Sequence, residues 1–322
     1  MMGSDSNSDR NENWQGEIVN RLAFAALNEQ RRTRRWNIFF RSLFIAYLFL
    51  LFFAFYLPER GDKVGITGGK HTALVDLKGV IADNSDANAD DIVSGLRSAF
   101  KDKNTVGVIL RINSPGGSPV QSAYIYNEIK RLRTKYPDKK LYTVVSDMAA
   151  SGGYYVASAA DEIYANQSSI VGSIGVLMNG FGFVDAMEKL GIERRLYTAG
   201  KYKGMLDPFS EIKPDEVDHV KTMLNEIHQQ FISAVREGRG DRLKENENIF
   251  SGMFWTAEEG KKLGLVDGFG SASYVAREII KQEKIVDYTP QPDYLERFAE
   301  RFGAASARVL AQVLGTKGGT IQ

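Results

Sequence analysis

The longest apolar stretch of the sequence lies near its N-terminus. Residues 42–57 read SLFIAYLFLLFFAFYL and contain no charged side chain. Sixteen helical residues reach only about 24 Å. We therefore expect Ile38 to Phe40 to extend them across the roughly 30 Å hydrocarbon core of a bilayer, with Arg41 reaching the interface. The pattern predicts a transmembrane anchor over residues 38–57.

Two other interpretations fit this segment less well. A buried core helix would carry a polar face, and this segment has none. A cleavable secretory signal would end in small residues, whereas Tyr56, Leu57 and Pro58 stand at the end here. Because five arginines precede the segment, the positive-inside rule places residues 1–37 in the cytoplasm. The rest of the chain is expected outside, which in a bacterial cell is the periplasmic side of the inner membrane.

Strand and helix patterns alternate after a charged, glycine-rich linker over residues 58–70. Strands are predicted over 72–82, 105–112 and 141–145, with a helix over 90–101 and another that starts at Pro119. Apolar strands separated by helices at this spacing are typical of an α/β fold with buried parallel strands. We expect one folded domain over residues 71–287 and a tail over residues 288–322.

A long helix is predicted from Pro214 to Glu237. Its apolar residues recur at helical spacing, which predicts a core-facing stripe formed by Val217, Val220, Met223, Leu224, Ile227 and Phe231. His219 and His228 lie on the same helix nine residues apart, so they do not face a common ligand.

Composition narrows the possible chemistry. Hydrophobic residues make up 43% of the 322 residues and charged residues 25%, which is ordinary for a globular protein. A net charge of +1 gives no bulk attraction to nucleic acid, and the absence of cysteine removes disulfides and a thiol nucleophile. The three histidines, which include His71, are too scattered to suggest a metal site. We therefore expect neither a metal nor another cofactor.

Two glycine-rich elements follow apolar strands. They are Asn113 to Ser118 (NSPGGS) and Ala149 to Tyr155 (AASGGYY). A serine at the start of a helix, followed by glycines, lets backbone N–H groups approach a developing oxyanion. Gly152 would supply one donor and the Gly116-Gly117 pair the second. The simpler alternative is that Ser151 only caps a helix and the first element is only a turn.

A serine nucleophile needs a general base, and the sequence has no histidine between Ser151 and His219. The segment from Gly200 to Gly204 (GKYKG) offers Lys201 and Lys203 instead. In an extended segment both lysines point the same way, so spacing does not choose between them. A free lysine has a pKa of about 10.4, so a lysine acting as base near pH 7 requires an apolar environment.

Five motifs together resemble the signal peptide peptidase A family in order and spacing. They extend over about residues 70–285 and are the strand with NSPGG, SDMAASGGYYVASAAD, GSIGV at 172–176, GKYKGMLDP, and WTAEEGKKLGLVDG at 255–268. The resemblance is to the family's short, single-domain, membrane-anchored members. It implies a Clp-protease-like or crotonase-like α/β fold, and a serine endopeptidase that degrades remnant signal peptides through a Ser/Lys dyad.

The resemblance also assigns roles to particular residues. It implies that Ser151 is the nucleophile, that Lys203 rather than Lys201 is the general base, and that Ser173 orients the lysine. It implies oxyanion donors at Gly152 and at Gly116 or Gly117. Members of the family assemble into dome-like or ring-like homo-oligomers, in which the lysine can reach the serine of a neighbouring protomer.

Three other interpretations remain open from the sequence. A crotonase-class enzyme acting on acyl-CoA would use a similar oxyanion hole but would not need Lys203. A conventional Ser-His-Asp peptidase would recruit His219 or His228. A membrane scaffold would carry the same elements in an inactive site.

Overall fold

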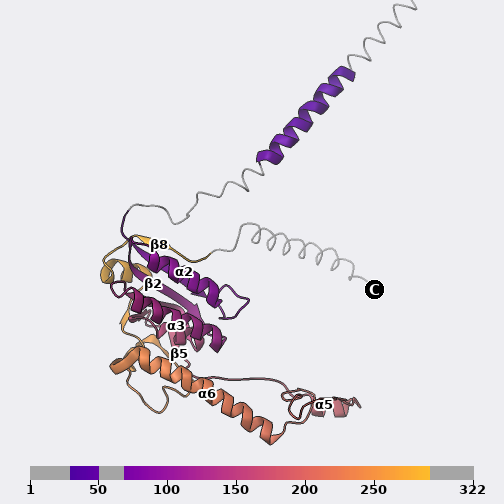
Figure 1. The fold of residues 1–322 in the computed structure, drawn as a ribbon, viewed down its shortest axis with the longest axis vertical. Coiled ribbons are helices and arrows are strands. Elements are labelled where there is room, and N and C mark those ends of the chain that lie inside the picture. The colour runs from indigo at the N-terminus through magenta and orange to yellow at the C-terminus, as the bar shows by residue number, and fades with distance from the viewer. Residues whose placement is uncertain (1–29, 51–68, 291–322) are drawn as a thin grey trace, which may run out of the picture. The chain divides into compact units, whose positions relative to one another are not determined.

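The computed structural model describes residues 30–50 and 69–290, which Figure 1 draws in colour. The chain divides into two units, Met1–Gly65 and Ile66–Gln322. In the first unit, residues 30–50 are helical and exposed. Among the described residues, no helix combines the length and the apolar character that crossing a membrane requires. Residues 51–57 of the expected anchor lie outside the described ranges.

An eight-stranded sheet forms the centre of the second unit. Its strands follow the order β6–β5–β3–β2–β1–β8, and β4 pairs with both β3 and β7. All pairings are parallel except that of β5 with the edge strand β6. The predicted α/β fold with parallel strands is therefore confirmed for this unit. The strands are β1 (His71–Lys78), β2 (Thr105–Ser114), β3 (Leu141–Ala150), β4 (Glu162–Ala165), β5 (Ile170–Gly172), β6 (Phe254–Thr256), β7 (Gly268–Phe269) and β8 (Ile285–Asp287).

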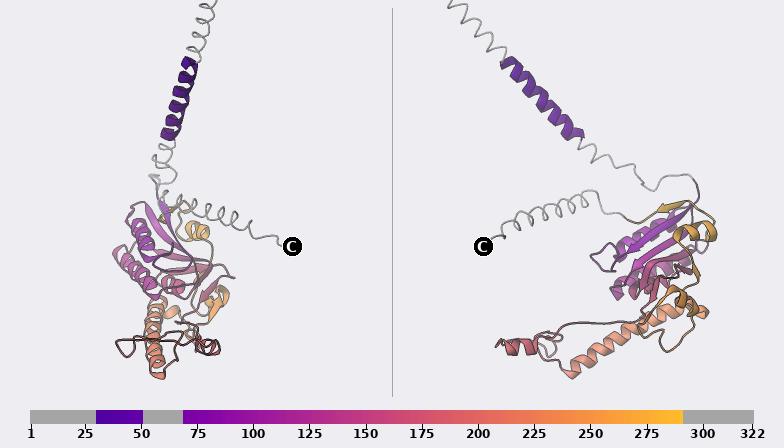
Figure 2. Two further views of the ribbon diagram at one scale, coloured as in Figure 1. Left: turned by 90° about the vertical axis from the view of Figure 1, so that its right-hand side faces the viewer. Right: turned by 180° about the vertical axis from the view of Figure 1, so that it is seen from behind.

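Helices cover both faces of the sheet, as Figures 1 and 2 show. Successive strand residues face opposite ways, so Val75 joins a core beneath α2 (Ala89–Lys101), α3 (Pro119–Lys135) and α4 (Gly152–Ala157). Its neighbour Leu74 joins a smaller core with Val275 and Ala276, which belong to the helical turn η2 (Val275–Ile279) after α8 (Ala272–Tyr274). Burial on both faces explains why these strands are almost continuously apolar.

Local signals set where the helices begin. The side chain of Ser118 accepts a hydrogen bond from the N–H of Gln121, and Pro119 occupies the first turn of α3, where its missing N–H costs nothing. Asn88 caps α2 in the same way through the N–H of Asp91. The helices expected after Asp90 and at Pro119 are thus confirmed.

Strand β3 exchanges partners halfway along its length. Tyr142 to Val145 pair with β4, whereas Met148 to Ala150 pair with β5. This fork places the carboxyl end of β5 beside the carboxyl end of β3. The residues that follow Ala150 and Gly172 are therefore neighbours.

Helix α6 (Pro214–Arg239) packs against α4 through its C-terminal half, and its N-terminal half extends away from the sheet. Phe231 and Val235 in its C-terminal half are buried, whereas Val217 and Leu224 in its N-terminal half are only half-buried. The expected core stripe is therefore buried at Phe231 and only half-buried at its other members, because Phe231 packs on Tyr155 of α4 and the outer half of α6 extends beyond that helix. Two short elements complete the fold, the 3₁₀ turn η1 (Gly240–Arg242) and α7 (Ala257–Lys262).

Residues 176–213, which we call the arm, lie at the N-terminal end of α6 and include the short helix α5 (Val184–Lys189). The arm closes on itself: the N–H of Phe183 donates to the carbonyl of Pro208 at 2.7 Å. The rings of Phe183 and Phe209 stack with centroids 5.5 Å apart. Figures 1 and 2 both show α5 far from the sheet.

Candidate active site

The two glycine-rich elements meet at the carboxyl ends of β2 and β3. Ser114 and Ala149 are paired in the sheet, so the turn after β2 lies against the start of α4. Gly116 has a φ of +103°, and a Cβ there would lie 2.7 Å from the Cβ of Ser151 and 2.7 Å from the N atom of Gly152. Only glycine allows this approach.

Ser151 occupies a strained strand-to-helix turn. Its φ of 51° and ψ of −123° are rare for a residue with a side chain, and such strain costs about 1–3 kcal/mol. Its side chain makes no capping hydrogen bond to α4. The alternative that Ser151 is simply a helix cap is therefore wrong. The backbone fixes the residue instead, because its N–H donates to Gly172 and its carbonyl accepts from Tyr155, both at 2.9 Å.

Two backbone N–H groups next to Ser151 are unpaired within residues 69–290. Gly152 is the first residue of α4, so its N–H has no partner within the helix. Gly117 lies opposite Ile81 in a parallel bridge, but its own N–H takes no part in it. The N–H of Ile81 donates to the carbonyl of Gly116, and the carbonyl of Ile81 accepts from the N–H of Ser118. A Cβ on Gly152 would lie only 3.2 Å from the N atom of Gly117, so the two groups are adjacent.

Gly116 differs from Gly117 in this respect. The N–H of Gly116 donates to the hydroxyl of the buried Ser114 at 3.1 Å. The two donors that remain are therefore Gly117 and Gly152, while Gly116 allows the loop to approach Ser151 closely because it has no Cβ. The two glycines cannot be distinguished from the sequence, because the choice depends on which N–H donates to the Ser114 hydroxyl.

Ser173 lies directly beside the Ser151 turn. It follows β5, whose last residue accepts the N–H of Ser151. Like Ser151 it has a positive φ, here 54°, and it is half-buried. Its N–H donates to the carbonyl of Met253 at 2.7 Å, which joins the turn to the segment before β6. The structure thus brings Ser151, Ser173 and the glycine loop together.

Aromatic side chains of α3 and α6 pack against α4. Tyr155 stacks on Phe231 of α6 with ring centroids 4.8 Å apart, and Tyr126 of α3 meets Tyr155 edge-on at 5.3 Å. Tyr154 is fully buried, and its hydroxyl donates to the carbonyl of Leu265 at 2.9 Å. Both tyrosines of the AASGGYY element therefore hold the helix that follows Ser151.

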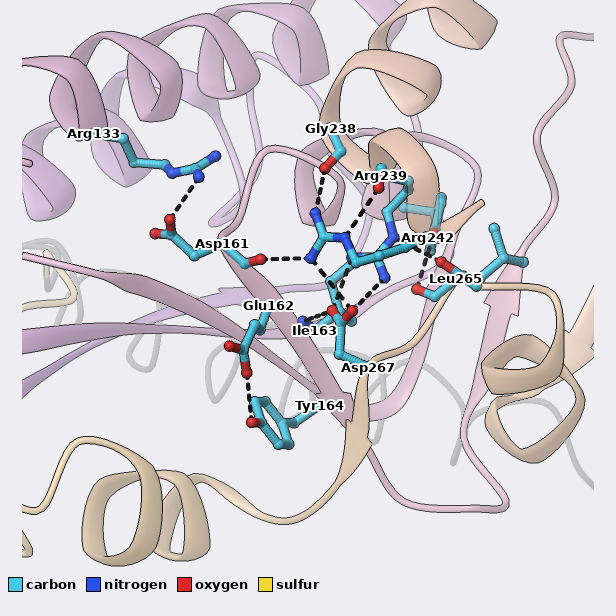
Figure 3. Close-up of polar contacts among 12 residues, drawn as sticks. Arg133, Asp161, Glu162, Ile163, Tyr164, Gly238, Arg239, Arg242, Leu265 and Asp267 are labelled. Carbon is cyan, nitrogen blue, oxygen red and sulfur yellow. Dashed lines mark hydrogen bonds and ion pairs between the residues drawn. The ribbon is translucent and has the colours of Figure 1, made fainter. Parts of the chain in front are cut away.

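The turn after α7 joins β4 and α6, as Figure 3 shows, and its Leu265 carbonyl accepts from Tyr154 of α4. The buried guanidinium of Arg239 donates to both carboxylate oxygens of Asp267, at 2.9 and 2.8 Å, and to the carbonyl of Gly264. Asp267 also accepts the N–H of Ile163 at 2.7 Å. Burial by itself would raise the pKa of Asp267, but the hydrogen bond and charge of Arg239 outweigh it and lower the pKa. This network explains the LGLVDG part of the last motif.

The two candidate lysines have different surroundings. The ammonium group of Lys201 donates to the hydroxyl of Tyr202 at 2.8 Å and lies 3.4 Å from the carboxylate of Asp215. The Tyr202 hydroxyl and then Asp215 raise the pKa of Lys201, which favours its charged form. Lys203 is exposed and has no side-chain hydrogen bond to any described residue. The surroundings of Lys201 therefore do not favour the neutral amine that a general base requires.

The structure does not bring Lys203 to Ser151 within one chain. Lys203 lies in a turn of the arm, where its N–H donates to Gly200. The arm packs at the outer end of α6, and Lys201 contacts Asp215 there. From Asp215 to Phe231 the helix rises about 24 Å at 1.5 Å per residue. Across the described residues, no hydrogen bond or ion pair joins the arm to Ser151 or Ser173.

The histidines do not form a triad with Ser151. His219 is exposed on the outer half of α6, and His71 is buried near Tyr288, with its Nε2 atom 2.9 Å from that hydroxyl. His228 lies nearer, but its Nε2 atom is 3.1 Å from the carbonyl of Ile174. Because a carbonyl only accepts, Nε2 carries the proton in this contact and Nδ1 is the basic nitrogen, and among the described residues no hydrogen bond joins His228 to Ser151. In the described ranges, no cluster of three His, Asp or Glu side chains is arranged to hold a metal ion.

Two protein families match parts of this chain. The family described as Peptidase family S49 matches residues 133–286, and the family described as Clp protease matches residues 74–170. Na(+)/H(+) antiporter NhaA of Brucella abortus is 44% identical over 215 residues, which cover 66% of this chain and 29% of that protein. The chain therefore spans less than a third of the length of that relative.

Two further relatives are covered more fully. Putative protease MJ0651 of Methanocaldococcus jannaschii is 34% identical over 245 residues, which cover 71% of this chain and 77% of that protein. Putative signal peptide peptidase SppA of Enterococcus faecium is 29% identical over 228 residues, which cover 68% of this chain and 66% of that protein.

Proposed function

Because this chain belongs to peptidase family S49, we propose that it is a membrane-anchored serine endopeptidase that degrades remnant signal peptides by acyl transfer. Ser151 is the nucleophile and Lys203 the general base. The observation that carries the proposal is the strained turn at Ser151 beside the two unpaired N–H groups of Gly117 and Gly152. This combination presents a hydroxyl and two oxyanion donors to the same point.

The reaction follows from these positions. The neutral amine of Lys203 takes the hydroxyl proton of Ser151 as its oxygen attacks the scissile carbonyl carbon. The negative charge that develops on the carbonyl oxygen is stabilised by the N–H groups of Gly117 and Gly152. The lysine then gives its proton to the leaving amine, which releases one product and leaves an acyl-Ser151 ester. The same lysine then takes a proton from water as the water oxygen attacks the ester carbon. As the bond from that carbon to the Ser151 oxygen breaks, the lysine gives this proton to the Ser151 oxygen, which releases the second product as an acid and restores both residues.

Lys203 acts on Ser151 of a neighbouring protomer in this proposal. Support comes from its position on the arm, about 24 Å along α6 from the helix turn that packs against α4. The arm also exposes large apolar side chains, among them Leu177, Phe181, Leu190, Tyr197 and Ile212, which are 73–89% exposed. Docking of the arm on another copy would bury these side chains and the lysine together. Burial against apolar surface favours an uncharged amine, as a general base requires.

Ser173 orients the incoming lysine. Its turn is tied to Ser151 through the bond between the Ser151 N–H and the Gly172 carbonyl, so the two serines keep a fixed relation. A serine hydroxyl can donate to a neutral amine and so hold it in place. The same contact would keep the lysine pointed at the Ser151 hydroxyl.

Apolar side chains next to both turns support an apolar peptide as the substrate. Val80, adjacent to the residue that bridges to Gly117, is 55% exposed. Beside the Ser173 turn, Met253 and Phe254 are 50% and 63% exposed, and the Met253 carbonyl accepts the N–H of Ser173. An extended apolar segment such as a signal peptide would cover these side chains on binding.

The uncharged run over residues 42–57, with five arginines before it, supports membrane anchoring. We place the N-terminus in the cytoplasm and the peptidase unit on the periplasmic side of a bacterial inner membrane. Extraction of membranes with alkaline carbonate should leave the full chain in the pellet. External protease added to spheroplasts should digest the peptidase unit, and digestion only after lysis would reverse the proposed orientation.

Four variants of the full chain test the catalytic assignment with a fluorogenic apolar peptide. Ser151→Ala and Lys203→Ala should each abolish turnover, whereas Lys201→Ala and His219→Ala should retain it. Turnover that persists without Lys203 but disappears without a histidine would establish a conventional triad. An inactive wild-type protein that is folded and assembled would argue against peptidase activity.

A further inference from the structure

His228 forms a hydrogen bond at the point where the arm leaves the rest of the protein. Its Nε2–H donates to the carbonyl of Ile174, the residue after Ser173, at 3.1 Å. Residues 176–213 leave the body of the protein just after this point, and α6 returns to it at His228. The bond therefore joins the segments on either side of the arm that carries Lys203.

The Ser173 turn is held by few bonds. Ser173 donates to Met253 at 2.7 Å, and Gly175 donates back to Ser173 at 3.0 Å, so the backbone curls tightly here. The positive φ of Ser173, 54°, makes this conformation costly for a residue with a side chain. Within residues 69–290, His228 provides the side-chain hydrogen bond to this turn. Loss of that bond would allow the strained backbone to relax and Ser173 to move.

The same face of α6 also supports the nucleophile. Phe231 lies three residues after His228, so both project from one side of the helix. Phe231 stacks on Tyr155 of α4, at 4.8 Å between ring centroids. One face of α6 thus contacts the elements that follow Ser151 and Ser173.

We propose that His228 is a positioning residue, whose Nε2–H holds the Ile174 carbonyl so that Ser173 keeps the conformation in which it orients the catalytic lysine. The inference rests on the proposed peptidase function. His228 touches neither substrate nor Ser151 in this role, and its effect on catalysis passes through Ser173.

Full-length protein and a fluorogenic apolar peptide provide the test. We expect His228→Leu to lower kcat by about tenfold, the order expected for losing one hydrogen bond that holds a reacting group in place, with KM little changed. His228→Gln should recover most of kcat, because its amide nitrogen is the same number of bonds from Cβ as the histidine Nε2. His228→Asn has a shorter side chain and should not. His219→Ala, an exposed position on the same helix, is the matched control.

A double variant separates positioning from general support of the fold. If His228 acts through Ser173, then adding His228→Leu to Ser173→Ala should cause little further loss of kcat. Multiplicative losses in the double variant would overturn the proposal, as would equal activity of the Gln and Asn variants. If His228→Leu fails to fold, the comparison of Gln with Asn still decides. Failure of the peptidase function itself would appear separately, as cleavage that does not depend on Ser151.

Discussion

The N–H of Ser151 donates to the carbonyl of Gly172 at 2.9 Å, and this bond joins two turns that both contain a serine with positive φ. The bond continues the parallel pairing of β3 with β5 by one further residue. Ser151 is therefore positioned by a sheet and not by a loop alone. A sheet held on both sides can support backbone strain that a free loop would relax.

The strain at Ser151 predicts opposite effects of one substitution on activity and stability. Ser151→Gly should abolish turnover and raise the free energy of unfolding by about 1 kcal/mol, because glycine adopts a φ of 51° without steric cost. Ser151→Ala should abolish turnover without this gain, since alanine keeps the Cβ. Thermal unfolding of the two inactive variants gives the comparison, and identical midpoints would show that the turn is unstrained.

Gly117 should tolerate no side chain. A Cβ there would overlap the backbone of Ile81, so Gly117→Ala must displace the loop that carries the unpaired N–H. We expect kcat/KM to fall by about 100-fold or more, as for loss of an oxyanion donor. Gly69→Ala is the matched control, because a Cβ at Gly69 meets no atom within 4 Å. Nearly unchanged kcat/KM in a folded Gly117→Ala protein would remove Gly117 from the site.

The ion pair of Asp267 with Arg239 predicts how stability depends on pH. The pKa of Asp267 is lowered in the folded state, so its contribution is present above the ordinary pKa of about 4 and is lost as the pH falls through the lowered value. Asp267→Asn leaves the buried Arg239 without its anion and should cost about 3 kcal/mol at pH 7.

The difference between wild type and Asp267→Asn should begin to shrink below about pH 4, where the Asp267 carboxylate of the unfolded chain takes up a proton, and should be lost at the lower pH at which the folded carboxylate is protonated. Urea unfolding at several pH values measures it. The exposed Glu258→Gln variant serves as the control and should follow wild type throughout. A difference that stays constant down to acidic pH would show that Asp267 acts by shape and not by charge.

Much of the sheet was predictable from local patterns. Thr105 to Ile112 is an apolar strand between polar ends, and Pro119 after Ser118 marks a helix start, so the structure only extends these elements by a residue or two. The resemblance to the signal peptide peptidase A family is confirmed by family membership. The resemblance rests on the order of the five motifs, which stays the same when the sequence between them changes.

Other features depended on distant contacts and were not predictable. The apolar residues of α6 indicate a buried face, but the sequence does not reveal that the contact with α4 lies at Phe231, near the C-terminal end of the stripe. The choice between Gly116 and Gly117 depends on the Ser114 hydroxyl, and the contact of His228 with Ile174 joins residues 54 apart. The roles of Ser151, Lys203 and Ser173 remain predictions that the variants above test.

Co-expression of two inactive full-length variants, Ser151→Ala and Lys203→Ala, tests most directly whether Lys203 serves the serine of a neighbour. Half of the protomers in a mixed assembly keep Ser151, and half of their neighbours keep Lys203. We predict recovery of about a quarter of wild-type peptidase activity, as expected for random mixing around a closed ring with head-to-tail contacts. Mixed assemblies that contain both chains and still cleave nothing would contradict a dyad shared between protomers.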